Sequence, residues 1–156
     1  MAQTGFVFSD EGRTLTVLND SGTTAITAGD LCGTGTNDNV LTGTAASARN
    51  AYGAGDIKVF SQVANNKYGA PMGVALADVA ADGYGGLALE GFFIHAVSEN
   101  VEAGDALQFY EGTANKLSVL DNPTTTVNAD VSKHKCGRAL TGGSADGKYI
   151  LWKLSL

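Results

Sequence analysis

The stretch Gly73-Val-Ala-Leu76, followed six residues later by Asp82-Gly83, decides the fold because it occurs twice. The second copy is Gly137-Arg-Ala-Leu140, and Asp146-Gly147 follows it at the same spacing. Asp-Gly is a strong signal for a turn between antiparallel strands, since such turns need a residue with positive φ. Self-similarity at a fixed spacing indicates a repeated structural unit. The pattern therefore predicts a small β-domain built from two similar halves.

Each copy of this pattern has the same surroundings in the chain. An Ala-Gly-Asp precedes each copy, at 28–30 and at 103–105, and an apolar stretch follows each. An aspartate in such a corner can accept hydrogen bonds from nearby backbone N–H groups, so Asp30 and Asp105 are expected to be structural. The same role is expected of three further aspartates in turns: Asp78, Asp82 and Asp146.

Length and composition favour one all-β domain. The chain has 156 residues, 21 of them glycine, and only 17% are charged. This mixture suits short strands and tight turns, and the length allows a sizeable core. Helix signals are weak, being confined to Thr44–Ala51 and Leu76–Ala81, where adjacent glycines disfavour a helix. We expect a small β-barrel or sandwich-like domain with two similar halves, long loops and an N-terminal arm.

The domain organisation follows from the distribution of apolar residues. Residues 1–12 are predicted to be the N-terminal arm, and residues 13–156 the β-domain. A loop-rich insertion is expected at about 36–70, because few large apolar residues occur there. Strands are predicted at 13–17, 57–60, 72–76, 87–97 with an interruption at Gly91, 107–110, 116–119, 136–140 and 148–154.

The charge pattern argues against polyanionic partners. The formal net charge is −6 and the ten basic residues are scattered, whereas nucleic-acid and anionic membrane surfaces need clustered Lys and Arg. No stretch approaches the roughly 20 apolar residues of a membrane helix. The first residues lack a secretory signal, so synthesis in the cytoplasm is expected. Cys32 and Cys136 are then predicted to remain thiols, a disulfide between them being the alternative.

Two chemical motifs have simpler structural interpretations. The stretch 142–148 fits the beginning of a phosphate-binding loop, but Tyr149 replaces its Ser or Thr and too few residues follow for the required helix. A hairpin turn is expected instead. His134 and Cys136, with the isolated His95 and Cys32, do not make the doubly paired spacing of a zinc site. We predict no catalytic residues, metal or cofactor, and therefore no enzymatic activity.

Aromatic residues divide into two groups. Most are expected in the core: Phe92, Phe93, Phe109, Tyr110 and Trp152. Phe6 and Phe8 instead precede the first confident strand and alternate about Val7. We predict that this arm adds as a strand to a neighbouring surface, with ordinary core packing as the alternative.

The order of these motifs resembles a known family, the DUF2190 capsid cement (decoration) proteins of tailed bacteriophages. The resemblance covers roughly 13–35 and 70–156. It is carried by Ile26-Thr-Ala-Gly-Asp30, Gly73-Val-Ala-Leu-Ala-Asp-Val79, Gly85-Gly-Leu-Ala-Leu-Glu-Gly91, Val101-Glu-Ala-Gly-Asp105 and Cys136-Gly-Arg-Ala-Leu140.

The resemblance implies a non-enzymatic β-domain that sits on the outer surface of an HK97-type capsid, usually as a homotrimer. Its partner would be the major capsid protein, and the protein would reach the virion after synthesis in the host cytoplasm. No site residue is carried over, because members generally lack an enzymatic site. This sequence departs from the family at 1–12 and about 36–70. The alternative function is a soluble carbohydrate- or ligand-binding β-module displayed on a virion.

Overall fold

The structure is a computed structural model, which describes residues 6–10, 12–19, 23–35, 58–61, 68–110, 114–120 and 135–156. Within these ranges the chain forms strands and turns and no helix, so the predicted all-β class is confirmed. The same ranges accordingly contain no helix that could cross a membrane. The predicted helical turns at 44–51 lie outside the described residues, and Leu76–Ala81 is a turn region.

The first half is a closed barrel in the order β2-β4-β3-β5-β6. Its strands are β2 (Thr14–Asn19), β3 (Leu31–Gly35), β4 (Lys58–Ser61), β5 (Tyr68–Ala75) and β6 (Tyr84–Ala88). β4 and the start of β5 fall within the span 36–70, so this span contributes strands to the barrel. The rest of the predicted insertion lies outside the described residues.

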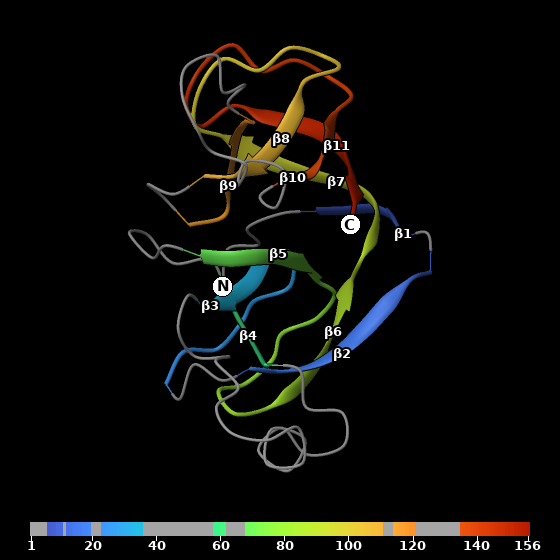
Figure 1. Cartoon of the computed structure of the whole chain (residues 1–156), viewed down its shortest axis with the longest axis vertical. Helices are drawn as coiled ribbons and strands as arrows, with labels where there is room; N and C mark the ends of the chain where they lie inside the picture. The colour runs from blue at the N-terminus through green and yellow to red at the C-terminus, as the bar shows by residue number, and fades with distance from the viewer. Residues whose placement is uncertain are drawn as a thin grey trace, which may run out of the picture.

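The second half is a six-stranded sheet in the order β1-β7-β11-β10-β8-β9, in which β7 also pairs with β9. Its strands are β1 (Phe6–Asp10), β7 (Glu90–Val97), β8 (Ala106–Phe109), β9 (Lys116–Val119), β10 (Lys135–Ala139) and β11 (Tyr149–Ser155). The pairing of β7 with β9 closes β7 to β11 into a ring, and β1 is added outside it on β7. Figure 1 shows this half above the first along the long axis of the molecule.

The two halves have the same strand order and directions. β2 is parallel to β4 and antiparallel to β6, and β7 is parallel to β9 and antiparallel to β11. The other neighbouring strands in each ring are antiparallel. Strands β2 to β6 therefore correspond to β7 to β11 in chain order, which confirms the predicted two-half architecture.

The strand register shows which residues of the two halves are equivalent. Leu18 pairs with Tyr84 and also begins the parallel contact with β4. Ala96 pairs with Tyr149 and begins the parallel contact with β9. Leu18 is thus equivalent to Ala96, and Tyr84 to Tyr149.

The repeated tetrads occupy equivalent positions, as predicted. The N–H groups of Ala75 and Ala139 each donate to the carbonyl of the aspartate in the preceding Ala-Gly-Asp corner, at 2.9 Å in both halves. β5 ends at Ala75 and β10 at Ala139. Leu76 and Leu140 therefore follow the strands, instead of lying within them as the sequence predicted.

The first residue of each tetrad is glycine for a steric reason. A Cβ on Gly73 would clash with the carbonyl oxygen of Ala88, and a Cβ on Gly137 would clash with that of Lys153. In each half the strand crosses its neighbour's backbone too closely for any side chain. The repeated Gly therefore marks a close approach of two strands and not a binding site.

The Asp-Gly turns differ by one residue from the predicted alignment. Positive φ occurs at Asp82 (57°) in the first half and at Gly147 (77°) in the second. The N–H of Asp82 donates to the Asn19 carbonyl at 2.9 Å, as that of Gly147 does to Val97 at 2.8 Å. Asp82 is therefore equivalent to Gly147 and not to Asp146, because the second turn is one residue longer.

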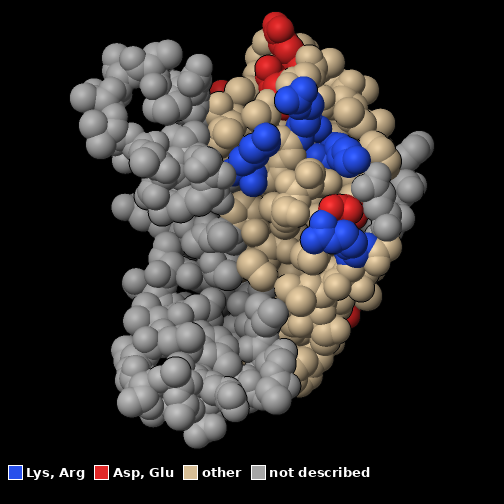
Figure 2. Space-filling model, turned by 45° about the vertical axis from the view of Figure 1, so that its right-hand side comes forward, with Lys and Arg blue, Asp and Glu red and all other residues tan. Residues whose placement is uncertain are grey.

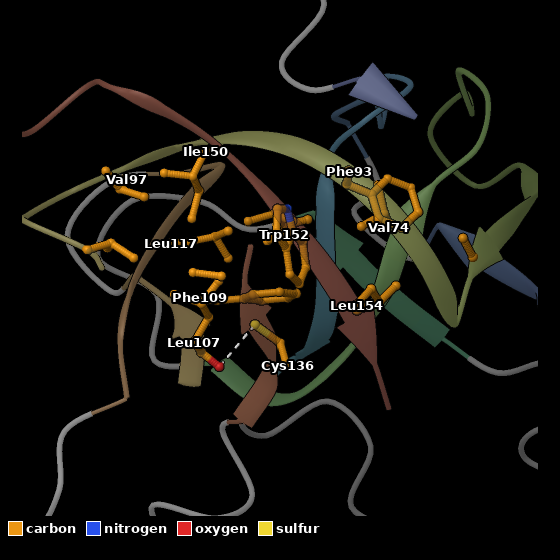
Figure 3. Packing of buried hydrophobic residues seen from close by; sticks show 14 residues of the cluster. Val74, Phe93, Val97, Leu107, Phe109, Leu117, Cys136, Ile150, Trp152 and Leu154 are labelled. Atoms are coloured by element: carbon orange, nitrogen blue, oxygen red, sulfur yellow. Dashed lines mark hydrogen bonds between the residues drawn. The ribbon is translucent and has the colours of Figure 1, made fainter. Parts of the chain in front are cut away.

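Two clusters of buried side chains form the core. The smaller belongs to the first barrel, and the larger, centred on Trp152, fills the second barrel and extends to Val74 of the first (Figure 3). Phe93, Phe109 and Trp152 are buried as predicted, whereas Phe92 is only half-buried, as is Tyr110, which follows the end of β8. Alternation along β7 explains the difference, since neighbouring residues face opposite sides of a strand.

The long apolar stretch 87–97 serves both halves. Its predicted interruption at Gly91 lies at Leu89, where β6 ends and β7 begins. The N–H of Leu89 donates to the Arg13 carbonyl at 2.9 Å, next to the start of β2. The break therefore marks the crossing from the first barrel to the second.

Candidate interaction surfaces

The buried cysteines and histidine have structural roles. Cys32 and Cys136 are free and buried, which confirms the predicted thiols. Burial raises the pKa of both thiols, so neither is the exposed thiolate that a nucleophile requires. The Cys136 thiol donates to the Leu107 carbonyl at 3.3 Å (Figure 3). His134 lies outside the described residues, among which no three His, Cys, Asp or Glu residues form a metal-binding group.

His95 links the two halves through its imidazole ring. Its Nδ1 accepts a hydrogen bond from the Trp152 indole Nε1 at 3.0 Å, so its Nε2 carries the proton and donates to the Gly29 carbonyl at 2.7 Å. Burial lowers the pKa of His95 to about 4, and the neutral ring is the form that this arrangement fits. His95 is therefore a polar component of the core.

The Ala-Gly-Asp corners are held as predicted. Oδ2 of Asp30 accepts from the Thr27 N–H at 2.8 Å, and Oδ2 of Asp105 accepts from the Glu102 N–H at 2.8 Å. Oδ1 of Asp30 also accepts from the side chain of Asn115 at 2.8 Å, which joins the first corner to the turn before β9. Both aspartates therefore have structural roles.

The stretch 142–148 is a turn between strands, as expected. The N–H groups of Gly143 and Gly147 donate to backbone carbonyls of Val101 and Val97, so they are unavailable to a phosphate. Strand β11 begins at Tyr149, where a phosphate-binding loop would start a helix. This arrangement is incompatible with the loop's geometry.

The predicted contact residues Phe6, Val7 and Phe8 lie on β1. Phe6 pairs with Ile94 and Val7 with Phe93, and the register shifts between Val7 and Ser9. The strand addition inferred from the sequence therefore occurs on β7 of the same chain. β1 ends the sheet order within the described residues, and contact with a capsid or neighbouring subunit stays a prediction.

A second surface, here called the outer face, is formed by β7, β10 and β11. Lys135 and Arg138 are both exposed, because a register shift between Lys135 and Gly137 turns the two side chains outward. Arg138 pairs across the strands with Lys153, whose Nζ lies 5.6 Å from the centre of the Phe92 ring. Figure 2 shows basic side chains on one side of the molecule, some of them with acidic side chains directly beside them.

The uncharged part of the outer face is largely apolar. Leu151 of β11 pairs with Ile94 of β7, and both are half-buried. Tyr149 is 61% exposed and Leu140 is 41% exposed. Sequence reasoning missed this face, although the alternation of Tyr149, Leu151 and Lys153 with buried residues along β11 was a usable signal.

Comparison with known proteins gives a likeness among solved structures. No protein-family model matches the chain, and no curated protein matches it. The chain is similar to the crystal structure of the head fiber gp8.5 N base in bacteriophage phi29, with 15% sequence identity and a TM-score of 0.49. The alignment covers 92% of this chain and 95% of that chain. A likeness of this size carries no functional assignment.

Proposed function

We propose that this protein is a capsid decoration (cement) protein of a tailed bacteriophage. It binds the outer surface of an assembled HK97-type shell as a homotrimer, after synthesis in the host cytoplasm, and stabilises that shell by binding alone. The observation that carries the proposal is the order and spacing of the motifs, which resemble those of the DUF2190 family.

The structural roles of these motifs support the proposal. The glycine of each tetrad permits the close strand approach, and the aspartate of each corner fixes the turn before the next strand. The motifs therefore describe a scaffold of two joined barrels. Closed barrels with short, hydrogen-bonded turns suit a protein whose task is to hold a fixed shape on a surface.

The mechanism of stabilisation is mass action. A ligand that binds only the assembled shell stabilises it by about 4 kcal/mol at a thousandfold excess over its dissociation constant. A closed trimer on a local symmetry axis would contact several capsid subunits at once, and such multivalent binding strengthens attachment without any single strong contact. In this proposal Phe6, Val7 and Phe8 of β1 contribute a contact with the shell or the next subunit.

The test uses shells that lack the protein, purified from a deletion phage. Added protein should co-sediment with expanded shells at saturable stoichiometry and raise the temperature at which they break open. Unexpanded shells and free major capsid protein serve as controls. Failure to co-sediment with expanded shells, with the added protein shown to be folded, would overturn the proposed function.

A further inference from the structure

We propose that the second Ala-Gly-Asp corner, residues 103–105, binds a carboxamide side chain of a partner protein in the way that Asn115 binds the first corner. The inference rests on the proposed function, because it names a contact through which a decoration protein would hold a capsid subunit. The internal repeat carries it, since the first corner shows what the second can bind.

The first corner is docked on the second barrel by two side chains. Nδ2 of Asn115 donates to Oδ1 of Asp30 at 2.8 Å, and Oδ1 of Asn115 accepts from the Leu31 N–H at 2.9 Å. The Gly29 carbonyl accepts from Nε2 of His95 at 2.7 Å. Gly29 and Asp30 are buried. The corner thus has three polar groups that the docked surface satisfies: a carboxylate oxygen, a strand N–H and a carbonyl oxygen.

Two of these groups lack a partner in the second corner. Oδ2 of Asp105 accepts from the Glu102 N–H, but Oδ1 has no donor among the described residues. In the same part of the chain no donor reaches the Gly104 carbonyl either. Gly104 is exposed and Asp105 is half-buried, whereas their counterparts in the first corner are buried. The segment that leads into β8 lies at the top of Figure 1, away from the first barrel, so the corner is open to a partner.

The third group is the N–H of Ala106, which is equivalent to Leu31. In an antiparallel strand the N–H and C=O of one residue point to the same side. The Ala106 carbonyl accepts from the Leu120 N–H at 2.8 Å, so the Ala106 N–H points to that side too, and it meets no acceptor among the described residues. Because the same backbone hydrogen bonds hold both corners, this N–H and Oδ1 of Asp105 are spaced for one bridging amide, as in the first corner.

An acceptor beside a donor selects a carboxamide. Asn and Gln side chains carry an NH₂ donor and a C=O acceptor, whereas Lys and Arg have no acceptor and a carboxylate has no donor. The negative charge of Asp105 would also repel a carboxylate. The exposed Gly104 carbonyl can take a further N–H of the partner, as its counterpart takes that of His95. The second corner therefore fits an Asn or Gln side chain on a protein surface.

The experiment compares two variants of the second corner with a matched change elsewhere. Asp105→Asn keeps an oxygen for the Glu102 N–H but turns the open acceptor into a donor. Ala106→Pro removes the open N–H at the first residue of β8, a position where a strand tolerates proline. The control, Asp78→Asn, alters an exposed aspartate that also accepts one backbone N–H, from Ala28. Circular dichroism and urea unfolding establish that each variant is folded.

The probe is the expanded shell purified from a deletion phage. The wild-type protein and Asp78→Asn should co-sediment with these shells equally, and each corner variant should bind about tenfold more weakly, because each leaves a polar group of the interface unpaired. Hydrogen exchange of the Ala106 amide should be slower in the shell-bound wild-type protein than in the free protein. A purely structural corner would show no such protection. Should Ala106→Pro fail to fold, this protection decides whether the N–H is part of the contact.

The outcomes separate this inference from the proposed function. If the wild-type protein binds shells, and the folded corner variants bind them as tightly as Asp78→Asn does, decoration stands and the second corner is not the contact. Weakened binding in Asp105→Asn with unchanged binding in Ala106→Pro would overturn the assignment to a carboxamide, since a cation needs the carboxylate and not the N–H. If the folded wild-type protein does not bind shells, the proposed function and this inference both fail.

Discussion

The two barrels share their backbone geometry but distribute side-chain volume differently. In the first half the side chain of Val79 occupies the space that a Cβ on Gly85 would need. In the second half Gly143 is equivalent to Val79, and Ile150 is equivalent to Gly85. A Cβ on Gly143 would lie 2.8 Å from Cγ2 of Ile150, so the large and small residues have exchanged places.

The comparison shows which features the two halves must keep. Both halves have the backbone hydrogen bonds at the corners and the glycines at close strand approaches. Their core side chains differ, and a change at one position is matched by a change at the position that packs against it. Three residues after the equivalent tyrosines, the first half has Leu87 and the second has Trp152. One residue before the equivalent Leu18 and Ala96, the first half has Val17 and the second has His95. The second half thus has an aromatic core with a polar link to the first.

The largest effect is expected at Trp152. Replacing it with Ala should lower the free energy of unfolding by about 4 kcal/mol, because it leaves a cavity and removes the donor to His95. Leu87→Ala, at the equivalent position, should cost about 3 kcal/mol. Urea unfolding measures both, and Trp152→Phe separates the lost hydrogen bond from the lost volume. A larger loss of unfolding free energy in Leu87→Ala than in Trp152→Ala would contradict this prediction.

The tetrad glycines should respond alike in the two halves. Gly73→Ala and Gly137→Ala each place a Cβ against a carbonyl oxygen and should cost about 3 kcal/mol by urea unfolding. Gly147→Ala is the control, since its Cβ would meet nothing within 4 Å and only the positive φ costs about 1 kcal/mol. If only one tetrad variant were destabilised, the halves would not be equivalent at this position.

Acid should destabilise the folded protein through His95. The equivalent residue of the first half, Val17, does not titrate. The pKa of His95 is lowered from 6.5 to about 4 by burial, so between these values the unfolded chain binds a proton that the folded chain does not. Stability should therefore fall by about 2 to 3 kcal/mol as pH drops from 6.5 to 4. Urea unfolding across this range should show a shallower fall in His95→Gln than in the wild-type protein. The same pH dependence of the unfolding free energy in both proteins would show that His95 is not the group responsible.

The smallest effects are expected at the corners. Asp30→Ala should cost about 2 kcal/mol, because it removes acceptors for both the Thr27 N–H and the Asn115 side chain. Asp105→Ala loses the single corner bond from Glu102 and should cost about 1 kcal/mol. Thermal unfolding of the two variants tests this order. The reverse order would mean that the Asn115 link adds no stability.

Local patterns in the sequence predicted most of the strands, the repeated corners and the two halves, but they missed β3 and treated the end of β6 and β7 as one interrupted strand. Those features depend on glycine, aspartate and alternating apolar residues within a few positions of one another. The parallel pairing of β2 with β4 and of β7 with β9 was not predicted, because it joins segments far apart in the chain. The one-residue difference between the Asp82 and Gly147 turns was missed for a similar reason, since only the tertiary hydrogen bonds reveal it.

The candidate surfaces were harder to predict than the fold. Phe6 and Phe8 suggested strand addition, but the sequence could not show that β7 of the same chain accepts β1. Phe92 was assigned to the core by residue type, although its position in β7 places it beside Lys153 on the outer face. Whether a strand residue faces inward depends on register, and a shift of one residue reverses it.

We propose that the protein holds the expanded shell from its outer surface as a closed trimer. Cryo-electron microscopy of expanded shells decorated with the purified protein tests this most directly. The predicted result is a closed trimer on the outer surface, seated on a local symmetry axis of the shell. Single copies scattered over the shell, or shells with no added density, would contradict this proposal.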